Sequence, residues 1–268
     1  MTNKIHPTAI IVDGAKIGKN VNIGPYCVIG ANVEIGDGTV LKSHVVIDGI
    51  TKIGQNNIIF SFAAIGHAPQ DLKYEGEKSQ IIIGDNNKIR EYVTIHPGTK
   101  SDKMVTKIGD NCLLMVSSHI AHDCVIGNDV ILANNATLGG HVMVEDHAVL
   151  GGLCAVHQFV RIGKHAMIGG MSGVENDVIP YGTVMGERAY LAGLNLIGLK
   201  RRGFERDAIH SLRNFYKKLF DEDSGSMSKN ITTLKEEYKD DLLVIEIINF
   251  LETKNSRAIC KPKSAKDE

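Results

Sequence analysis

Aliphatic residues recur at every sixth position over most of the chain. The first run is unbroken from Ile5 to Ile65, and its phase returns at Ile83, Ile89 and Ile95. A second run, shifted by one residue, extends from Ile108 to Val174. An amphipathic helix repeats about every 3.6 residues and a simple strand about every 2, so neither produces this pattern. Short strands joined by tight corners do, with two inward side chains per strand and a glycine where the backbone turns.

Two interruptions of the period predict loops that leave this repetitive body, near residues 67–80 and 98–107. The first contains an acid and a base, Asp71 and Lys73, and the second contains Thr99-Lys100-Ser101-Asp102-Lys103. Beyond Pro180 the period stops, and segments 206–220, 231–238 and 242–251 have helical spacing. The pattern therefore predicts a β part over 1–190 and an α-helical C-terminal domain over 191–268.

Composition narrows the range of partners. A chain of 268 residues with 43% hydrophobic content can bury a large core. The net charge of −1 gives no reason to expect nucleic acid as a partner. No apolar segment of about 18 residues and no signal-peptide core occurs, so we expect a cytoplasmic protein without integral membrane contact. The five cysteines include no Cys-x-x-Cys pair, which favours reduced thiols over a disulfide or zinc framework; we expect no metal and no cofactor.

The six-residue period resembles that of the hexapeptide-repeat family, over about residues 5–185. The resemblance implies a mainly β fold: a left-handed parallel β-helix with three strands, or eighteen residues, per coil, followed here by the α-helical domain. The left hand comes from the family, because parallel crossover connections are otherwise nearly always right-handed.

A coil of eighteen residues brings polar residues of the second run together. The run contains His119-Ile120-Ala121-His122-Asp123-Cys124, and an imidazole is the side chain whose pKa lies closest to neutral. Adding eighteen places Gly140 above His122 and His141 above Asp123, with Gln158 above Gly140. His157 should lie near the same edge. Neighbouring residues of a strand point to opposite sides, so pairing His122 with Asp123 requires a corner conformation.

Other polar residues have simpler interpretations. We interpret His44, His147 and His165 as solvent-facing corner residues, and His6 and His96, each followed by proline, as structural. Lys200-Arg201-Arg202 is the best candidate for an anion site, because guanidinium groups match phosphate oxygens. A solvated basic helix terminus explains that cluster equally well.

Four segments resemble one enzyme family, the UDP-N-acetylglucosamine O-acyltransferases that begin lipid A synthesis. They are the segment 119–124, Leu132-Ala133-Asn134-Asn135-Ala136-Thr137-Leu138, Val156-His157-Gln158-Phe159 and Gly198-Leu199-Lys200-Arg201-Arg202-Gly203-Phe204. The resemblance implies that a sugar 3-hydroxyl attacks the thioester of a 3-hydroxyacyl group on acyl carrier protein. It also implies a homotrimer with active sites between subunits.

The same resemblance assigns roles by motif. His122 would be the general base, Asp123 would orient it, and the Gly140 N–H would stabilise the oxyanion. Gly170 would border an open groove for a long acyl chain. Two residues depart from the family pattern near the expected nucleotide contacts: Ile197 stands where relatives carry an acidic residue, and Arg188 replaces a histidine. The implied substrate-binding residues are Asp71, Lys73, His119, His141, His157, Gln158, Asn195, Arg201 and Arg202. Of these, Asn195, Arg201 and Arg202 would bind the uridine diphosphate.

Alternatives remain open at the level of sequence. The same base would also suit an acceptor with a 3-amino group. A trimeric zinc carbonic anhydrase uses this scaffold with three histidine ligands, but it does not explain the loops or the helical tail. The related N-acyltransferase carries a uridine-binding domain before its repeats, whereas here the repeats begin at Ile5. A purely structural solenoid would show flat faces of a single residue type, which the clustered histidines do not.

Overall fold

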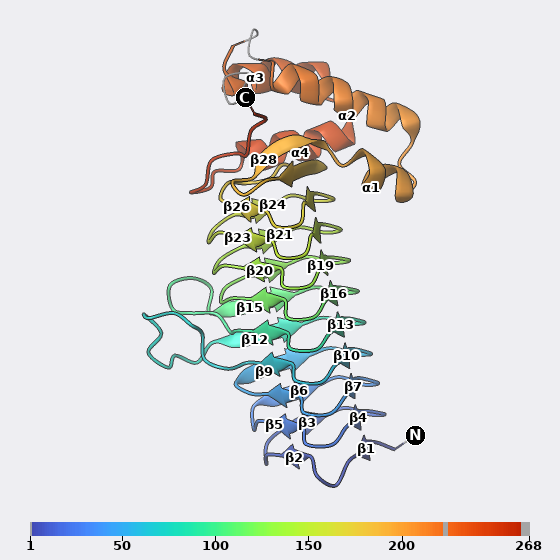
Figure 1. Ribbon diagram of the computed structural model, residues 1–268, viewed down its shortest axis with the longest axis vertical. Coiled ribbons are helices and arrows are strands. Elements are labelled where there is room, and N and C mark those ends of the chain that lie inside the picture. The colour runs from blue at the N-terminus through green and yellow to red at the C-terminus, as the bar shows by residue number, and fades with distance from the viewer. Residues whose placement is uncertain (1, 222–224, 264–268) are drawn as a thin grey trace.

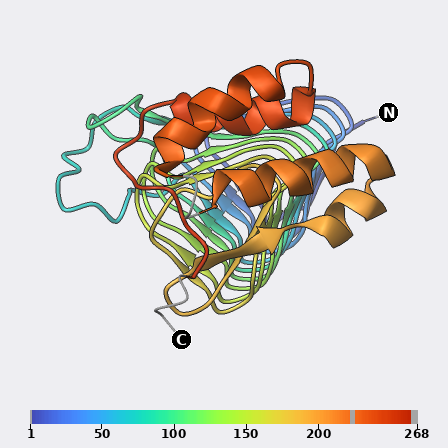
Figure 2. The same cartoon turned by 90° about the horizontal axis from the view of Figure 1, so that it is seen from above.

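The computed structural model describes residues 2–221 and 225–263, which form a stack of short strands with helices at one end (Figure 1). Seen along the stack (Figure 2), the coils superpose and the helices lie across the end. The fold is the left-handed parallel β-helix of hexapeptide repeats, mainly β, with C-terminal helices.

Three sheets form the faces of the β-helix, and successive strands along the chain belong to successive sheets except for the last two, which both belong to the first sheet. All described strand pairs are parallel except the pair formed by these last two strands. The first sheet contains β1 (Lys4–Ile5), β4 (Asn22–Ile23), β7 (Val40–Leu41), β10 (Ile58–Ile59), β13 (Lys88–Ile89), β16 (Leu113–Leu114), β19 (Ile131–Leu132), β22 (Val149–Leu150), β25 (Met167–Ile168), β27 (Gly182–Met185) and β28 (Tyr190–Leu194). The second contains β2 (Ile10–Ile11), β5 (Val28–Ile29), β8 (Val46–Ile47), β11 (Ala64–Ile65), β14 (Thr94–Ile95), β17 (His119–Ile120), β20 (Thr137–Leu138), β23 (Ala155–Val156) and β26 (Gly173–Val174). The third contains β3 (Lys16–Ile17), β6 (Val33–Ile35), β9 (Ile50–Ile53), β12 (Gln80–Ile83), β15 (Val105–Ile108), β18 (Val125–Ile126), β21 (Met143–Val144) and β24 (Arg161–Ile162).

Two loops interrupt the coils without disturbing the register. The first loop, residues 66–79, joins β11 to β12, and the second loop, residues 96–104, joins β14 to β15; both project to one side of the stack (Figures 1 and 2). Ile59 still pairs with Ile89 across the first loop, and Ile89 pairs with Leu114 across the second. The inward aliphatic is thus kept in phase on either side of each insertion.

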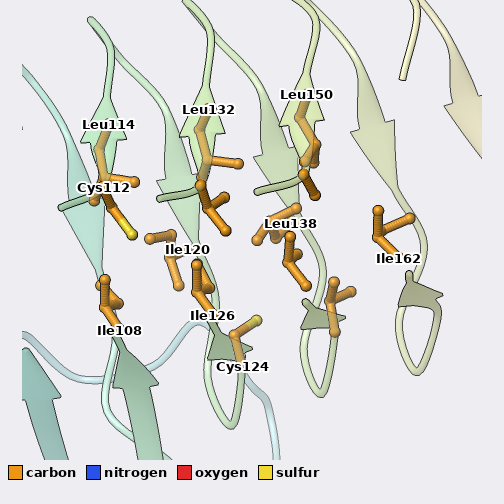
Figure 3. Close-up of a cluster of buried hydrophobic side chains, with 14 of the residues drawn as sticks. Ile108, Cys112, Leu114, Ile120, Cys124, Ile126, Leu132, Leu138, Leu150 and Ile162 are labelled. Atoms are coloured by element: carbon orange, nitrogen blue, oxygen red, sulfur yellow. The ribbon is translucent and has the colours of Figure 1, made fainter. Parts of the chain in front are cut away.

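The periodic aliphatic residues form the core. Leu114, Leu132 and Leu150 lie in a row on adjacent coils, and Ile120 and Leu138 pack beside them (Figure 3). All five side chains are fully buried. Burying an aliphatic side chain of this size contributes about 1.5–3 kcal/mol relative to exposure, so the stack is stabilised by many equal layers.

The corners differ from the prediction that glycine is the turning residue. At most corners a non-glycine residue takes the left-handed conformation, as at Asn20 (φ 58°) and Asn56 (φ 54°). The glycine after the aliphatic is needed because coils approach closely. A β-carbon on Gly18 would lie 2.9 Å from the carbonyl oxygen of Ile35 on the next coil.

Four helices follow the β-helix in the described part of the chain: α1 (Leu196–Arg201), α2 (Arg206–Leu219), α3 (Met227–Glu237) and α4 (Leu242–Glu252). The short helix α1 lies before the segments whose spacing predicts helices, and Asn195 caps it by accepting from the Gly198 N–H at 3.0 Å. None of these helices is both long and apolar enough to cross a lipid bilayer.

The C-terminal segment returns to the β-helix after α4. Asp177 is fully buried, and its carboxylate accepts from Arg161 Nε at 2.7 Å and from the Asn255 amide at 2.8 Å. The backbone of Asp177 also bonds to Ala258 and Cys260. These bonds fix residues 255–260 against the last coils. The sequence-based division at residues 190 and 191 falls within β28, which pairs antiparallel with β27.

Candidate active site

His122 and Asp123 occupy the corner between the second and third sheets. We call this corner, with residues 140–141 and 158–159 of the next two coils, the His122 corner. Asp123 has φ 58°, and this left-handed residue brings the two side chains together. Nδ1 of His122 lies 2.9 Å from Oδ2 of Asp123. Because an ionised carboxylate only accepts, the hydrogen bond assigns the proton to Nδ1 and leaves a lone pair on Nε2.

Thr99 of the second loop holds the Asp123 carboxylate. The Thr99 N–H donates to both carboxylate oxygens at 3.0 Å, and its hydroxyl donates to Oδ2 at 2.6 Å. Burial alone would raise the pKa of the Asp123 carboxyl, but the hydrogen bonds from His122 and Thr99 outweigh it and lower the pKa. Asp123 therefore stays charged and fixes the orientation of His122.

Gly140 and His141 lie one coil above this pair. The His141 N–H donates to the His122 carbonyl oxygen at 3.0 Å. The His141 ring meets the His122 ring edge-on, with centroids 4.9 Å apart, and stacks on Phe159 at 4.3 Å. No acceptor among the described residues pairs with the Gly140 N–H, so it is available to a substrate oxygen. The predicted grouping of these residues is confirmed as geometry.

His119 lies on β17, before the corner. Its Nδ1 is 2.7 Å from the Thr94 hydroxyl, and its ring is edge-on to His96 with centroids 5.0 Å apart. Burial, followed by the charge on His122, lowers the pKa of His119. Burial and the neighbouring histidines lower the pKa of His96 to about 4. Both rings are therefore neutral near pH 7. His119 is hydrogen-bonded to Thr94, whereas Nδ1 of His96 is buried without a partner among the described residues.

His157 and Gln158 extend the site by one more coil. The Phe159 N–H donates to the Gly140 carbonyl oxygen at 3.1 Å, which places Gln158 next to Gly140 along the stack. Nδ1 of His157 is hydrogen-bonded to the guanidinium of Arg257, from the C-terminal segment.

Several predicted residues lie elsewhere in the single chain. Asp71 accepts from the Lys73 N–H at 3.0 Å within the first loop, and in the described structure neither side chain is hydrogen-bonded to the histidines. Gly170 lies at the corner between the first and second sheets. A β-carbon there would meet only Gly152 within 4 Å, its carbonyl oxygen at 3.2 Å.

The predicted nucleotide residues lie at the corner between the third and first sheets. The Asn195 amide donates to the His165 carbonyl oxygen at 3.0 Å, and Arg202 donates to the His147 carbonyl oxygen at 2.7 Å. Burial lowers the pKa of Arg202. Arg201 is exposed at the end of α1.

The two residues that depart from the family pattern are exposed, whereas one of the histidines interpreted as solvent-facing is buried. Ile197 is 67% exposed on α1, and Arg188 lies 3.6 Å from Glu175. The solvent-facing interpretation is wrong for His165, which is only 6% exposed and stacks between His147 and Tyr181. Its ring extends an aromatic column, and burial lowers its pKa to about 4.

One group in the described chain has the composition of a metal site. The ligand atoms of His122, Asp123 and His141 lie within 4.8 Å of one another. Each is already engaged: Asp123 accepts from Thr99 and His122, and Nδ1 of His141 faces Asp102 at 3.1 Å. A zinc ion needs three ligands at about 2.0–2.2 Å, so one that took the Asp123 carboxylate as a ligand would compete with the hydrogen bonds from Thr99 and His122.

Sequence reasoning missed four contacting residues: Thr94, Thr99, Asp102 and Arg257. Thr99 and Asp102 belong to the second loop, whose composition had been noted. Their contacts were not predictable because the insertion breaks the eighteen-residue period that relates sequence to position. Nothing in the sequence around Arg257 indicates that it contacts His157, which lies 100 residues earlier.

The fold and the polar corner define the class as a hexapeptide-repeat transferase, and a family model described as bacterial transferase hexapeptide matches residues 14–49 and 106–140. A second model, described as UDP-N-acetylglucosamine O-acyltransferase domain 2, matches residues 177–260. The chain belongs to the UDP-N-acetylglucosamine O-acyltransferase family.

Relatives match over almost their whole length. The acyl-(acyl-carrier-protein)-UDP-N-acetylglucosamine O-acyltransferase of Bartonella henselae is 50% identical, over 97% of this chain and 94% of its own. The enzyme of the same name from Rickettsia canadensis is 52% identical, over 96% and 97%. The solved UDP-N-acetylglucosamine acyltransferase of Francisella novicida superposes with a TM-score of 0.94 at 41% identity, over 98% of this chain and 95% of its own.

Proposed function

We propose that the protein transfers a 3-hydroxyacyl group from acyl carrier protein to the 3-hydroxyl of UDP-N-acetylglucosamine, in the cytoplasm, as the first step of lipid A synthesis. The relatives carry acyl carrier protein and UDP-N-acetylglucosamine in their names. The observation that carries the mechanism is the His122–Asp123 pair beneath the free Gly140 N–H.

In this mechanism His122 is the general base. Nε2 takes the proton of the sugar hydroxyl as its oxygen attacks the thioester carbonyl carbon. The Gly140 N–H donates to the oxyanion that forms. Collapse of the tetrahedral intermediate breaks the carbon–sulfur bond, and the proton on Nε2 passes to the departing thiolate. A general base contributes about 10²–10⁴ in rate, and one oxyanion donor about 10²–10³.

The remaining assigned residues bind substrate. His119, His141, His157 and Gln158 surround the His122 corner within one chain. The acyl chain follows the open surface beside Gly170, where only the coil below is within contact distance. Asp71 and Lys73, in the first loop, also bind substrate. The uridine diphosphate is bound by residues from another part of the chain, Asn195, Arg201 and Arg202.

A homotrimer accounts for that separation. Asn195 and Arg202 contact His165 and His147, at a different corner of the three-sided β-helix from His122. A face of the third sheet lies between the two corners, so one chain does not present both sets to one sugar nucleotide. A second copy that places this other corner beside the His122 corner completes the site, and a cyclic trimer satisfies the requirement for all copies.

The test is radiolabelled acyl transfer from a panel of 3-hydroxyacyl carrier proteins, using metal-free, chelator-washed protein. We expect transfer to UDP-N-acetylglucosamine, a fall in kcat of about 10² or more for His122→Ala, and no change for the control His6→Ala at the exposed N-terminus. Transfer only to the 3-amino analogue would correct the acceptor. Activity that depends on added zinc, or full activity of His122→Ala, would overturn the proposed mechanism.

A further inference from the structure

Two charged residues from outside the coils contact histidines of the candidate site. Asp102, in the second loop, places Oδ2 3.1 Å from Nδ1 of His141. Arg257, in the segment after α4, is hydrogen-bonded through Nη2 to Nδ1 of His157. The same ring nitrogen therefore faces an anion in one histidine and a cation in the other.

These partners fix opposite protonation patterns. A carboxylate only accepts, so Nδ1 of His141 carries the proton and Nε2 keeps a lone pair. Asp123 lies 3.9 Å from the same Nδ1 and favours the same assignment. A guanidinium only donates, so Nδ1 of His157 holds the lone pair and Nε2 carries the proton. The two rings thus offer different groups to a ligand.

The Arg257 contact is built into the fold. Its Nε donates to the Gln158 carbonyl oxygen at 2.9 Å. That carbonyl oxygen also lies 3.4 Å from Nδ1 of His157, which is long for a hydrogen bond, so the shorter contact between Nδ1 and the Arg257 guanidinium decides where the proton lies. Asn255, two residues earlier, is anchored to the buried carboxylate of Asp177 and to the Phe159 carbonyl oxygen at 2.9 Å.

The Asp102 contact is likewise held by its loop. Lys100 donates through its backbone N–H to Glu77 of the first loop at 2.9 Å, and its ammonium group pairs with Glu75. On the inner side Thr99 is tied to Asp123. Residues 99 and 100, just before Asp102 in the chain, are therefore fastened to the Asp123 carboxylate and to the first loop, and the Asp102 N–H donates to the Thr99 carbonyl oxygen at 3.3 Å.

We propose that Asp102 and Arg257 are positioning residues that set opposite tautomers on His141 and His157. Given the proposed function, His141 then offers a lone pair to a sugar hydroxyl, and His157 offers an N–H to a carbonyl or phosphate oxygen. The histidines of the site all belong to the β-helix, and the second loop and the C-terminal segment supply the residues that position them.

The test is NMR of protein labelled with ¹⁵N in its histidine rings, because long-range correlations distinguish an Nδ1–H from an Nε2–H ring. His141→Gln and His157→Gln serve only to assign signals. We expect wild-type His141 as Nδ1–H and His157 as Nε2–H. Asp102→Leu should release the first assignment and Arg257→Leu the second. Asp102→Glu and Arg257→Lys, which keep the accepting or donating character, should restore them.

Kinetics provide the second readout. We expect Asp102→Leu and Arg257→Leu to raise KM for the sugar nucleotide about tenfold with kcat changed less than about threefold, because binding and not the base is altered. Lys103→Gln and Lys254→Gln, which remove a charge from the same two segments, should change neither spectra nor KM. Wild-type tautomers opposite to those stated would overturn the inference even in an active enzyme. The stated tautomers in a protein that acylates no acceptor would overturn only the proposed function.

Discussion

The His122 imidazole lies directly against the α-carbon of Gly140, so that a β-carbon on Gly140 would sit 2.5 Å from Nε2 and 3.0 Å from Nδ1 of that ring. Non-bonded heavy atoms do not approach a β-carbon this closely, so something would have to shift. Glycine at position 140 is therefore required for the observed position of the His122 ring.

Gly140→Ala tests this relationship, since alanine keeps the N–H and adds only the methyl group. We expect kcat to fall about 10²-fold, because a displacement of the base of about 1 Å is enough to cost that much. In a His122→Ala background the same substitution should have little further effect, since the ring it displaces is gone. A fully active Gly140→Ala enzyme would show that the ring does not occupy this position during catalysis.

Thr99→Val removes a hydroxyl that donates to the buried Asp123 carboxylate at 2.6 Å. A hydrogen bond to a charged group is worth about 1.5–3 kcal/mol, and we expect a loss of that order in the free energy of unfolding measured in urea. The pKa of Asp123 should rise toward its ordinary value, because one of the groups that lowers it is lost. The ionised Asp123 carboxylate stabilises the folded protein at neutral pH, and this stabilisation is lost as pH falls through the pKa of Asp123 in the folded state. Because that pKa is higher in the variant, the variant should lose the stabilisation at a higher pH than wild type.

Thr99→Ser is the matched control, because it retains the hydroxyl and the backbone donor. It should stay within about 1 kcal/mol of wild type. Equal destabilisation by serine and valine would mean that the threonine methyl group, and not its hydroxyl, matters at this position.

Acid should destabilise the protein through two buried histidines. The pKa values of His96 and His165 are lowered to about 4, from the ordinary 6.5. Between these values the unfolded chain binds protons that the folded chain does not. The free energy of unfolding therefore falls as pH decreases through this window, by at most about 1.4 kcal/mol per pH unit for each group.

The His165→Phe variant separates this effect from carboxylate titration. Phenylalanine preserves the stack on Tyr181, whose ring centroid lies 5.5 Å away, and Nδ1 of His165 has no hydrogen-bond partner to lose. We expect urea unfolding to show a smaller loss of stability between about pH 6.5 and pH 4 than in wild type. An unchanged slope would contradict the burial of a neutral imidazole at this corner.

Gly170 should permit a long acyl chain. The space around its α-carbon is open except for Gly152 on the coil below. We expect wild type to turn over fastest with donors longer than ten carbons. Gly170→Met should shift the preference to shorter chains without changing KM for the sugar nucleotide, measured with the same donor panel. Highest wild-type turnover on the ten-carbon donor would refute the open groove.

The sequence by itself determined the coils, because one inward aliphatic every six residues is a local rule that each strand obeys independently. Once the coil length is known, the rule also places His122 beneath Gly140 and Asp123 beneath His141. The strand pairs Ile120 with Leu138 and Leu132 with Leu150 follow from the same spacing.

Only the tertiary structure decided which groups polarise the histidines and which residues bear the left-handed turns. Thr99 and Asp102 lie in an insertion whose path depends on contacts between two loops. Arg257 reaches His157 from a hundred residues away because Asp177 anchors the returning segment. Such contacts depend on the free energy of the assembled chain, and no repeat in the sequence encodes them. The burial of His165 under Tyr181 was missed for the same reason: it depends on how the coils end.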